Sequence, residues 1–124
     1  MGMYTELYLA CNLKKDTPEN ILNWLKGDTE TPFTQLKNTR LEKNNMKYSS
    51  YYFYAQPHQE ITYDSISKSY HLLLLFNLKN YDNEIHKLLI CVMPYIDAYE
   101  GEHLGHTRYE EDRIPTLIFK EKEN

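Results

Sequence analysis

The segment from Ser69 to Lys79 constrains the fold most, because it contains five consecutive apolar residues, Leu72 to Phe76. Successive side chains of a β-strand point to opposite faces of the sheet, so this run places apolar groups on both faces. Such a pattern is typical of a strand that is covered on both sides. We therefore predict a strand that is central in its sheet, with His71 on one face together with every second residue after it.

Other segments show the alternation of apolar and polar residues that is typical of half-buried strands. They are Met3 to Leu13, Met46 to Gln56, Glu102 to Tyr109 and Ile114 to Phe119. The last two flank the charged residues Glu110 to Arg113, which predicts a closing hairpin. Gln59 to Tyr63 predicts either a short extension of the preceding strand or an edge strand.

Two further segments carry apolar residues at helical spacing. For the first, Thr17 is a candidate cap, Pro18 suits the first helical position and Gly27 is a natural end. For the second, Asn80 is a candidate cap, and Pro94 should end or kink the helix. Two helices on one face of an antiparallel sheet predict an α+β, two-layer, ferredoxin-like βαββαβ sandwich with an extra C-terminal strand.

The length of 124 residues is that of one domain, so we expect residues 1–124 to form a single α+β domain. Residues 28–45 form a long polar connection, which is functional, mobile or partly helical around Leu36 to Leu41. Residues 120–124 are expected to be a solvated tail.

The cysteine content indicates a reducing compartment, because Cys11 and Cys91 are far apart and each lies in an apolar segment. Buried free thiols are the simplest interpretation. The N-terminal residues show no secretory signal, and no apolar run approaches the ~20 residues that cross a bilayer. We expect a soluble cytoplasmic protein that does not contact membranes.

The charge balance disfavours nucleic acid as a general ligand. The chain carries 14 basic and 18 acidic residues, for a net charge of −4. Such a chain has no overall attraction for a phosphate backbone. It also contains 12 tyrosines. Tyrosine suits binding surfaces but is equally at home on half-buried strands, so both interpretations stay open.

No motif for catalysis is present in the sequence. It has no G-x-S-x-G elbow and no glycine-rich phosphate loop, since Gly2, Gly27, Gly101 and Gly105 are isolated. We predict no catalytic residue and no cofactor. Enzyme activity stays open, with His71 or the carboxylates of the closing hairpin as its alternative carriers.

His103 and His106 resemble a metal-binding pair, but their spacing of three places them on opposite faces of a strand. Only a bulge at Gly105 would bring them to the same face. Glu100 and Glu102 could then add oxygen ligands to a weak site. We predict no metal site, with that weak site as the alternative.

The candidate binding residues fall on the sheet face that carries His71 and on the polar segment around the closing hairpin. In a two-layer fold the sheet face away from the helices is free to receive a ligand, a partner or a second copy. The acidic hairpin is either a solvated turn or an electronegative patch for a basic partner. The candidate ligand- or partner-binding residues are Tyr51, Tyr52, Tyr54, His71, Tyr99, His106, Arg108, Tyr109 and Glu110.

Several phrases of the sequence occur together in a recognisable set. They are Met3 to Leu7, Lys14 to Glu19, Asn77 to Ile85, Pro94 to Asp97, Arg108 to Asp112 and Pro115 to Leu117. As a set they resemble short, functionally unassigned proteins carried by bacteria, phages and prophages. The resemblance implies an accessory gene of a mobile element, of a kind that often binds and inhibits a host or defence protein, and it implies no activity or catalytic residue.

These observations favour a small non-catalytic binding module that acts on a protein partner or on a second copy of itself, as a possible homodimer. A sharper form is an inhibitor of a nucleic-acid-handling defence protein, which predicts a basic partner and salt-sensitive binding. The alternative is a small-molecule or nucleotide-binding domain that uses the tyrosine-rich sheet face.

Overall fold

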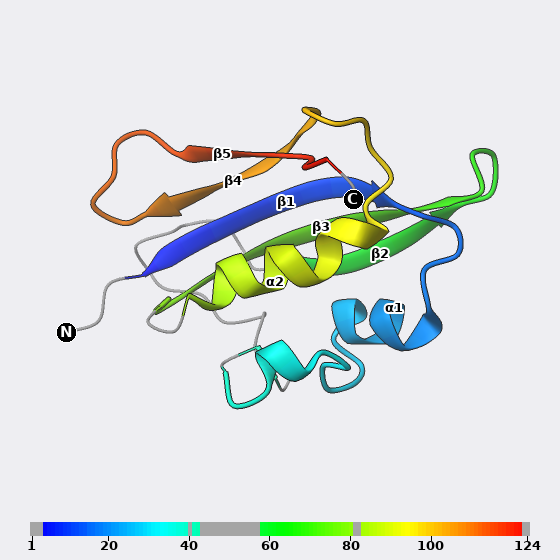
Figure 1. Cartoon of the computed structure of the whole chain (residues 1–124), viewed down its shortest axis with the longest axis horizontal. Coiled ribbons are helices and arrows are strands. Elements are labelled where there is room, and N and C mark those ends of the chain that lie inside the picture. The colour runs from blue at the N-terminus through cyan, green and yellow to red at the C-terminus, as the bar shows by residue number, and fades with distance from the viewer. Residues whose placement is uncertain (1–3, 40, 43–57, 81–82, 123–124) are drawn as a thin grey trace.

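The fold was described from a computed structural model, in which residues 4–39, 41–42, 58–80 and 83–122 are described. The strands are β1 (Thr5–Leu13), β2 (His58–Asp64), β3 (Ser69–Leu78), β4 (His103–Tyr109) and β5 (Thr116–Phe119). The helices are α1 (Glu19–Lys26) and α2 (Glu84–Val92), with short 3₁₀ helices η1 (Thr34–Leu36) and η3 (Met93–Tyr95). Figure 1 shows the two α-helices beside one continuous sheet.

The described strands form one five-stranded sheet in the order β2-β3-β1-β4-β5. Every neighbouring pair is antiparallel. β3, the strand predicted to be central, is an interior strand with β2 and β1 on its two sides, and β1 holds the middle position. Gln59 to Tyr63, which left two interpretations open, lies in the edge strand β2. The predicted tyrosine-rich strand from Met46 to Gln56 lies outside the described residues.

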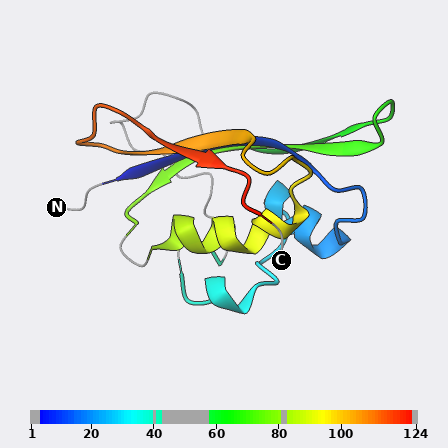
Figure 2. The ribbon, with the colours of Figure 1, turned by 45° about the horizontal axis from the view of Figure 1, so that its top comes forward.

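Both α-helices lie on the same side of the sheet, as Figure 2 shows most clearly. The alternation of β1 and β3 turns one set of their side chains toward the helices, and these are almost completely buried. Trp24, Leu25, Leu88 and Val92 meet them from the helices and are fully buried. Each such side chain contributes about 1.5–3 kcal/mol on burial. The predicted α+β two-layer class is confirmed. The buried strand residues of this covered face are Leu7, Leu9, Leu13, Leu72, Leu74, Phe76 and Leu78.

The ends of α1 agree with the sequence on one side only. Gly27 has a φ of +90° and ends the helix as predicted, with its N–H donated to Trp24 O at 3.0 Å. The N–H of Asp28 donates to Asn23 O at 2.9 Å, which completes the capping pattern. The predicted Thr17 cap is wrong, because the Thr17 hydroxyl donates to Lys14 O at 2.6 Å and no side chain caps the helix.

The ends of α2 follow the sequence. The Asn80 side-chain oxygen accepts the N–H of Ile85 at 3.0 Å, so Asn80 satisfies an N-terminal donor as predicted. Pro94 lies in η3, where the α-helix has already given way to a tighter turn. The missing N–H of Pro94 thus coincides with the end of the helix.

The described part of the long connection is folded against the helices. Leu36, in η1, and Leu41 are both fully buried. Trp24 donates its indole N–H to Leu41 O at 3.4 Å and makes an edge-on contact with the ring of Phe33. Two leucines among polar neighbours therefore anchor this segment, where composition alone suggested a polar linker.

Candidate partner-binding site

The sheet face opposite the helices, called here the open face, carries no described helix (Figure 2). Its polar side chains come from β1, β2, β3 and β4, which the sheet order places side by side. The register pairs Asn12 with His71 and Tyr8 with His106, so residues far apart in the chain share this face. The main polar and aromatic side chains of the open face are Glu6, Tyr8, Asn12, His58, Glu60, Thr62, Asp64, His71, His103, His106 and Arg108.

His71 lies between two oxygen acceptors. Its Nδ1 is hydrogen-bonded to Asn12 Oδ1, and its Nε2 lies 3.5 Å from Asp64 Oδ2. An imidazole ring satisfies two acceptors at once only when both nitrogens carry protons. The arrangement therefore favours the imidazolium form of His71, with Asp64 as its counter-charge.

Asp64 is held in its charged form by the turn that joins β2 to β3. The N–H of Ile66 donates to its carboxylate at 2.9 Å, and this bond is the largest cause of a lowered Asp64 pKa. Hydrogen bonds from Ser67 and from His71 lower the pKa further. The end of the open face near the turn thus keeps a negative charge at neutral pH.

A second cluster lies where β1 meets β4. The rings of Tyr8 and His106 stack with centroids 5.4 Å apart and an interplanar angle of 17°. Glu6 Oε2 lies 3.9 Å from His106 Nε2 and 3.8 Å from Arg108 Nε. The Glu6 side chain is 13% exposed, which reduces solvent screening of this pair. The cluster orders the aromatic and charged groups of this end of the face.

An open groove of about 570 Å³ runs between these two clusters. It crosses β1, β2 and β3, and its floor is partly apolar through Ala10 and Leu73. Glu60 lies beside it, and its carboxylate is 3.0 Å from His58 Nδ1. The other groove residues are Tyr8, Cys11, Asn12, Thr62, His71, Leu72 and Glu102.

The structure separates the candidate residues named from the sequence. His71, His106 and Arg108 share the open face through the register of β1 with its two neighbours. Tyr99 lies in the turn before β4, where it is 86% exposed. Tyr109 pairs with Thr5 at the end of β4, in the opposite orientation to Arg108.

Glu110 lies beyond the end of β4, and its N–H donates to Tyr4 O at 3.0 Å. It therefore belongs to the connection between β4 and β5 and stands apart from the groove. Tyr51, Tyr52 and Tyr54 lie outside the described residues. The acidic hairpin and the sheet face are thus separate surfaces within the described chain.

The sequence interpretation missed several residues of the open face. Glu6, Tyr8 and Asn12 share one phase of the β1 alternation, and that phase was available as a signal. Glu60 and Asp64 carried no such signal. They reach the site because β2 pairs with β3, which brings Thr62 opposite His71.

His103 and His106 show how a bulge changes an expectation. The β4–β5 register shifts between His103 and Gly105, so His103 pairs with Phe119 and His106 with Leu117. Both histidines therefore lie on the open face. The His103 Nε2 is hydrogen-bonded to Gly105 O at 2.9 Å. Among the described residues, no group of three His, Cys, Asp or Glu side chains could hold a metal ion.

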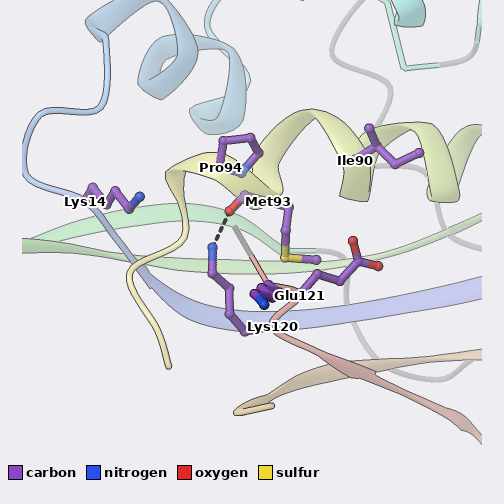
Figure 3. A pocket seen from close by; sticks show the side chains of 7 residues that line it. Lys14, Ile90, Met93, Pro94, Lys120 and Glu121 are labelled. Carbon is purple, nitrogen blue, oxygen red and sulfur yellow. Dashed lines mark hydrogen bonds between the residues drawn. The ribbon is translucent and has the colours of Figure 1, made fainter. Parts of the chain in front are cut away.

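A second pocket, of about 370 Å³, lies between the end of α2 and the C-terminal end of β5 (Figure 3). Lys120 is 4% exposed and its ammonium donates to Met93 O at 2.8 Å, the dashed bond in the figure. This bond ties β5 to the end of the helix layer. Ile90 and Met93 supply the apolar part of the pocket, and Lys14 and Lys122 lie at its border.

The two thiols are poor nucleophiles. Burial raises the pKa of Cys11 to about 12, and the nearby charge of Lys120 offsets this only in part. Burial also raises the pKa of Cys91. Both groups therefore remain protonated at neutral pH, and the thiolate is the reactive form.

Comparison with known proteins gives no relative for this chain: no family model, no curated protein and no solved structure matches it. The geometry of the site is therefore the basis for any functional inference. Within the described residues, no helix is long and apolar enough to cross a membrane.

Proposed function

We propose that the chain is a non-catalytic binding module that receives a basic surface of a protein partner on the open face of its sheet. The observation that carries the proposal is the charge of this face. Glu6, Glu60, Asp64 and Glu102 contribute carboxylates, whereas Arg108 is its guanidinium group. An excess of carboxylates favours a partner of opposite charge and accelerates its association.

The shape of the face supports a macromolecular partner. The polar groups extend over four neighbouring strands, and the groove between them is open along its length. Tyr8 is 36% exposed and Leu73 is partly exposed, so apolar contact area lies within the polar surround. Protein interfaces combine an apolar or aromatic centre with a polar rim in this way.

The chemistry of the face supports a non-catalytic role. His71 is engaged by Asn12 and Asp64, neither of which is a nucleophile for covalent catalysis of the serine or cysteine type. The Cys11 thiol has a raised pKa and belongs to the face that the helices cover. These groups have the properties of a binding surface, with charges fixed by hydrogen bonds.

The biological setting in this proposal comes from the resemblance noted in the sequence. We propose a cytoplasmic accessory protein of a phage or another mobile element, whose partner is a host or defence protein. A defence protein that handles nucleic acid carries a basic surface, which matches the charge of the open face. The proposal therefore joins the resemblance to the electrostatics through one kind of partner.

We also propose that the topology is ferredoxin-like with one added strand. The order β2-β3-β1-β4, with α1 after β1 and α2 after β3, supports two split βαβ units side by side. β5 then extends the sheet beyond β4. An experimental structure of the whole chain tests this, and a further strand between these neighbours would contradict it.

The binding proposal is tested by affinity capture from host lysate with matched variants. The double variant E60K/D64K reverses charge on the open face, and E19K/D28K makes the same change on exposed residues at the two ends of α1. Proteins retained by the wild type and by E19K/D28K, but lost by E60K/D64K and by raised salt, support the proposal. Equal retention by all three proteins contradicts it.

A small molecule or nucleotide is the second candidate, favoured by the stacked rings of Tyr8 and His106 beside the groove. Native mass spectrometry of the purified protein distinguishes it. Extra mass that leaves on denaturation, and that a Tyr8→Ala variant no longer carries, favours the small molecule. A bare protein mass favours the macromolecular partner.

A further inference from the structure

We propose that two copies of this chain pair through their β5 strands, which joins their sheets into one and places their α2 helices side by side. The interface is independent of the open face. It is carried by an apolar edge, by a register in which β5 is complementary to itself, and by opposite charges at the two ends of the strand.

The β5 edge is apolar where the other edge of the sheet is polar. Leu117 and Phe119 are 51% and 47% exposed, and no described strand lies beyond β5. At the other edge, β2 carries His58, Glu60 and Asp64. Charged side chains protect an edge strand against pairing with another chain, and an apolar edge lacks this protection.

The backbone of β5 has groups in position for a new strand. The N–H of Lys120 donates to Glu102 O, and its C=O accepts from Gly101, so both its groups point into the molecule. Backbone groups alternate in direction along a strand, so those of Leu117 and Phe119 point outward. These two residues supply the donors and acceptors for a ladder with another chain.

An antiparallel pair of β5 strands is self-complementary in one register. With a two-fold axis at Ile118 and perpendicular to the sheet, Leu117 of one copy lies opposite Phe119 of the other, and the reverse. Both residues lie on the open face, and both have outward backbone groups, so they form a hydrogen-bonded pair. The same register therefore satisfies the backbone and buries leucine against phenylalanine.

The helix layer extends the same interface. Ile90 of α2 is 54% exposed, and it lines a groove of about 330 Å³ with Met93, Leu117 and Phe119. Figure 3 shows Ile90 and Met93 on the side of the helix that faces the C-terminal end of β5. A perpendicular two-fold axis keeps both helix layers on the same side. The two α2 helices then add apolar area to a strand pair, which alone falls short of the ~800 Å² per partner of a stable interface.

The charges at the two ends of β5 are complementary in this arrangement. Glu110, Glu111 and Asp112 precede the strand, and Lys122 follows it. Antiparallel pairing brings the acidic start of one copy next to the lysine end of the other. A parallel arrangement would bring like charges together, so the charge pattern favours the antiparallel pair.

The dimer is tested by sedimentation velocity of the purified full chain over a range of concentrations. The wild type is expected to show a concentration-dependent dimer. Leu117→Glu should raise its dissociation constant roughly 100-fold, because the symmetric change removes two apolar contacts. Ile66→Glu, at a residue that is 93% exposed in the β2–β3 turn, is the matched control and should dimerise normally. Circular dichroism of both variants confirms that they are folded.

The register is tested by cysteine cross-linking. Leu117→Cys and Phe119→Cys proteins, mixed and mildly oxidised, should form more covalent dimer than either protein alone. A wild type that is monomeric at all concentrations overturns the proposal. So does a dimer that resists Leu117→Glu, or one whose mixed cross-link is no stronger than the separate ones.

Discussion

The two faces of the sheet are built from the same strands but obey different rules. On the covered face, Leu7, Leu9 and Leu74 are fully buried against the helices. On the open face, their neighbours Glu6, Tyr8 and Leu73 remain partly or largely exposed. The comparison teaches that the alternation of a strand separates stability from recognition, because burial makes apolar packing decisive on one face and leaves polar groups available on the other.

Gly105 offers the strongest way to break this arrangement, because it affects the strand pairing on which both faces depend. An added Cβ at Gly105 would lie 2.0 Å from the carbonyl oxygen of Tyr8. Gly105→Ala is therefore expected to cost more than about 4 kcal/mol of unfolding free energy. Urea denaturation of the variant measures this loss.

Gly101→Ala is the control for that experiment. Its added Cβ meets nothing within 4 Å, but its φ of +85° disfavours a side chain. A loss of about 1 kcal/mol is expected from the backbone conformation alone. If the two alanine variants were equally stable, the close approach of β4 to β1 would not be essential.

Adjacent leucines of β3 sharpen the comparison directly. Leu74 is fully buried on the covered face, whereas Leu73 is partly exposed on the open face. Leu74→Ala should cost about 2–5 kcal/mol, since a buried cavity remains, and Leu73→Ala about 1 kcal/mol or less. Chemical denaturation compares the two. Equal losses would mean that the open face is buried as deeply as the covered one.

Cys11 tests the covered face through pH. Its native pKa is about 12 against an ordinary value of 9.0, so the thiol ionises more easily in the unfolded chain. Above pH 9 the native state binds more protons, and stability therefore falls as pH rises toward 12. The expected slope is on the order of 1 kcal/mol per pH unit. Denaturation from pH 8 to 11 should give a flatter profile for Cys11→Ala, and parallel profiles would contradict a buried thiol.

Asp64 provides the smallest expected effect, on the open face. Its native pKa is lowered from 3.8 by hydrogen bonds, chiefly from the Ile66 N–H. The stabilisation is therefore present above the ordinary value and is lost as pH falls through the native pKa. Asp64→Asn should lose less of its melting temperature between pH 5 and pH 2 than the wild type. An identical acid dependence would show that these hydrogen bonds do not stabilise the charged carboxylate in solution.

Local sequence was sufficient where neighbouring residues decide the structure. The alternation of β1, the Gly27 end of α1 and the Asn80 bond to α2 all depend on contacts within a few positions. Thr17 failed as a cap because the Lys14 carbonyl offered its hydroxyl a competing local acceptor. Leu36 and Leu41 were underestimated because their burial depends on Trp24 and the helix layer, which polar neighbours in sequence do not reveal.

The candidate site was less predictable, because its residues meet across strands. His71 could be assigned to its face from β3 alone, but Asp64 reaches it only through the β2–β3 turn. His103 reaches the same face as His106 only through the register shift at Gly105. A shift of one residue reverses the face of a side chain, so register decides which candidates meet.

The sequence by itself determined the α+β class, the number of layers and the two phases of β1 and β3, because side-chain periodicity follows from backbone geometry. Only the tertiary structure decided that β1 lies in the middle, that carboxylates from β1 and β2 gather on the open face, and that β5 is left as an apolar edge. The physical reason is that strand pairing joins residues by hydrogen bonds between distant segments, and no local pattern encodes which segments will be neighbours.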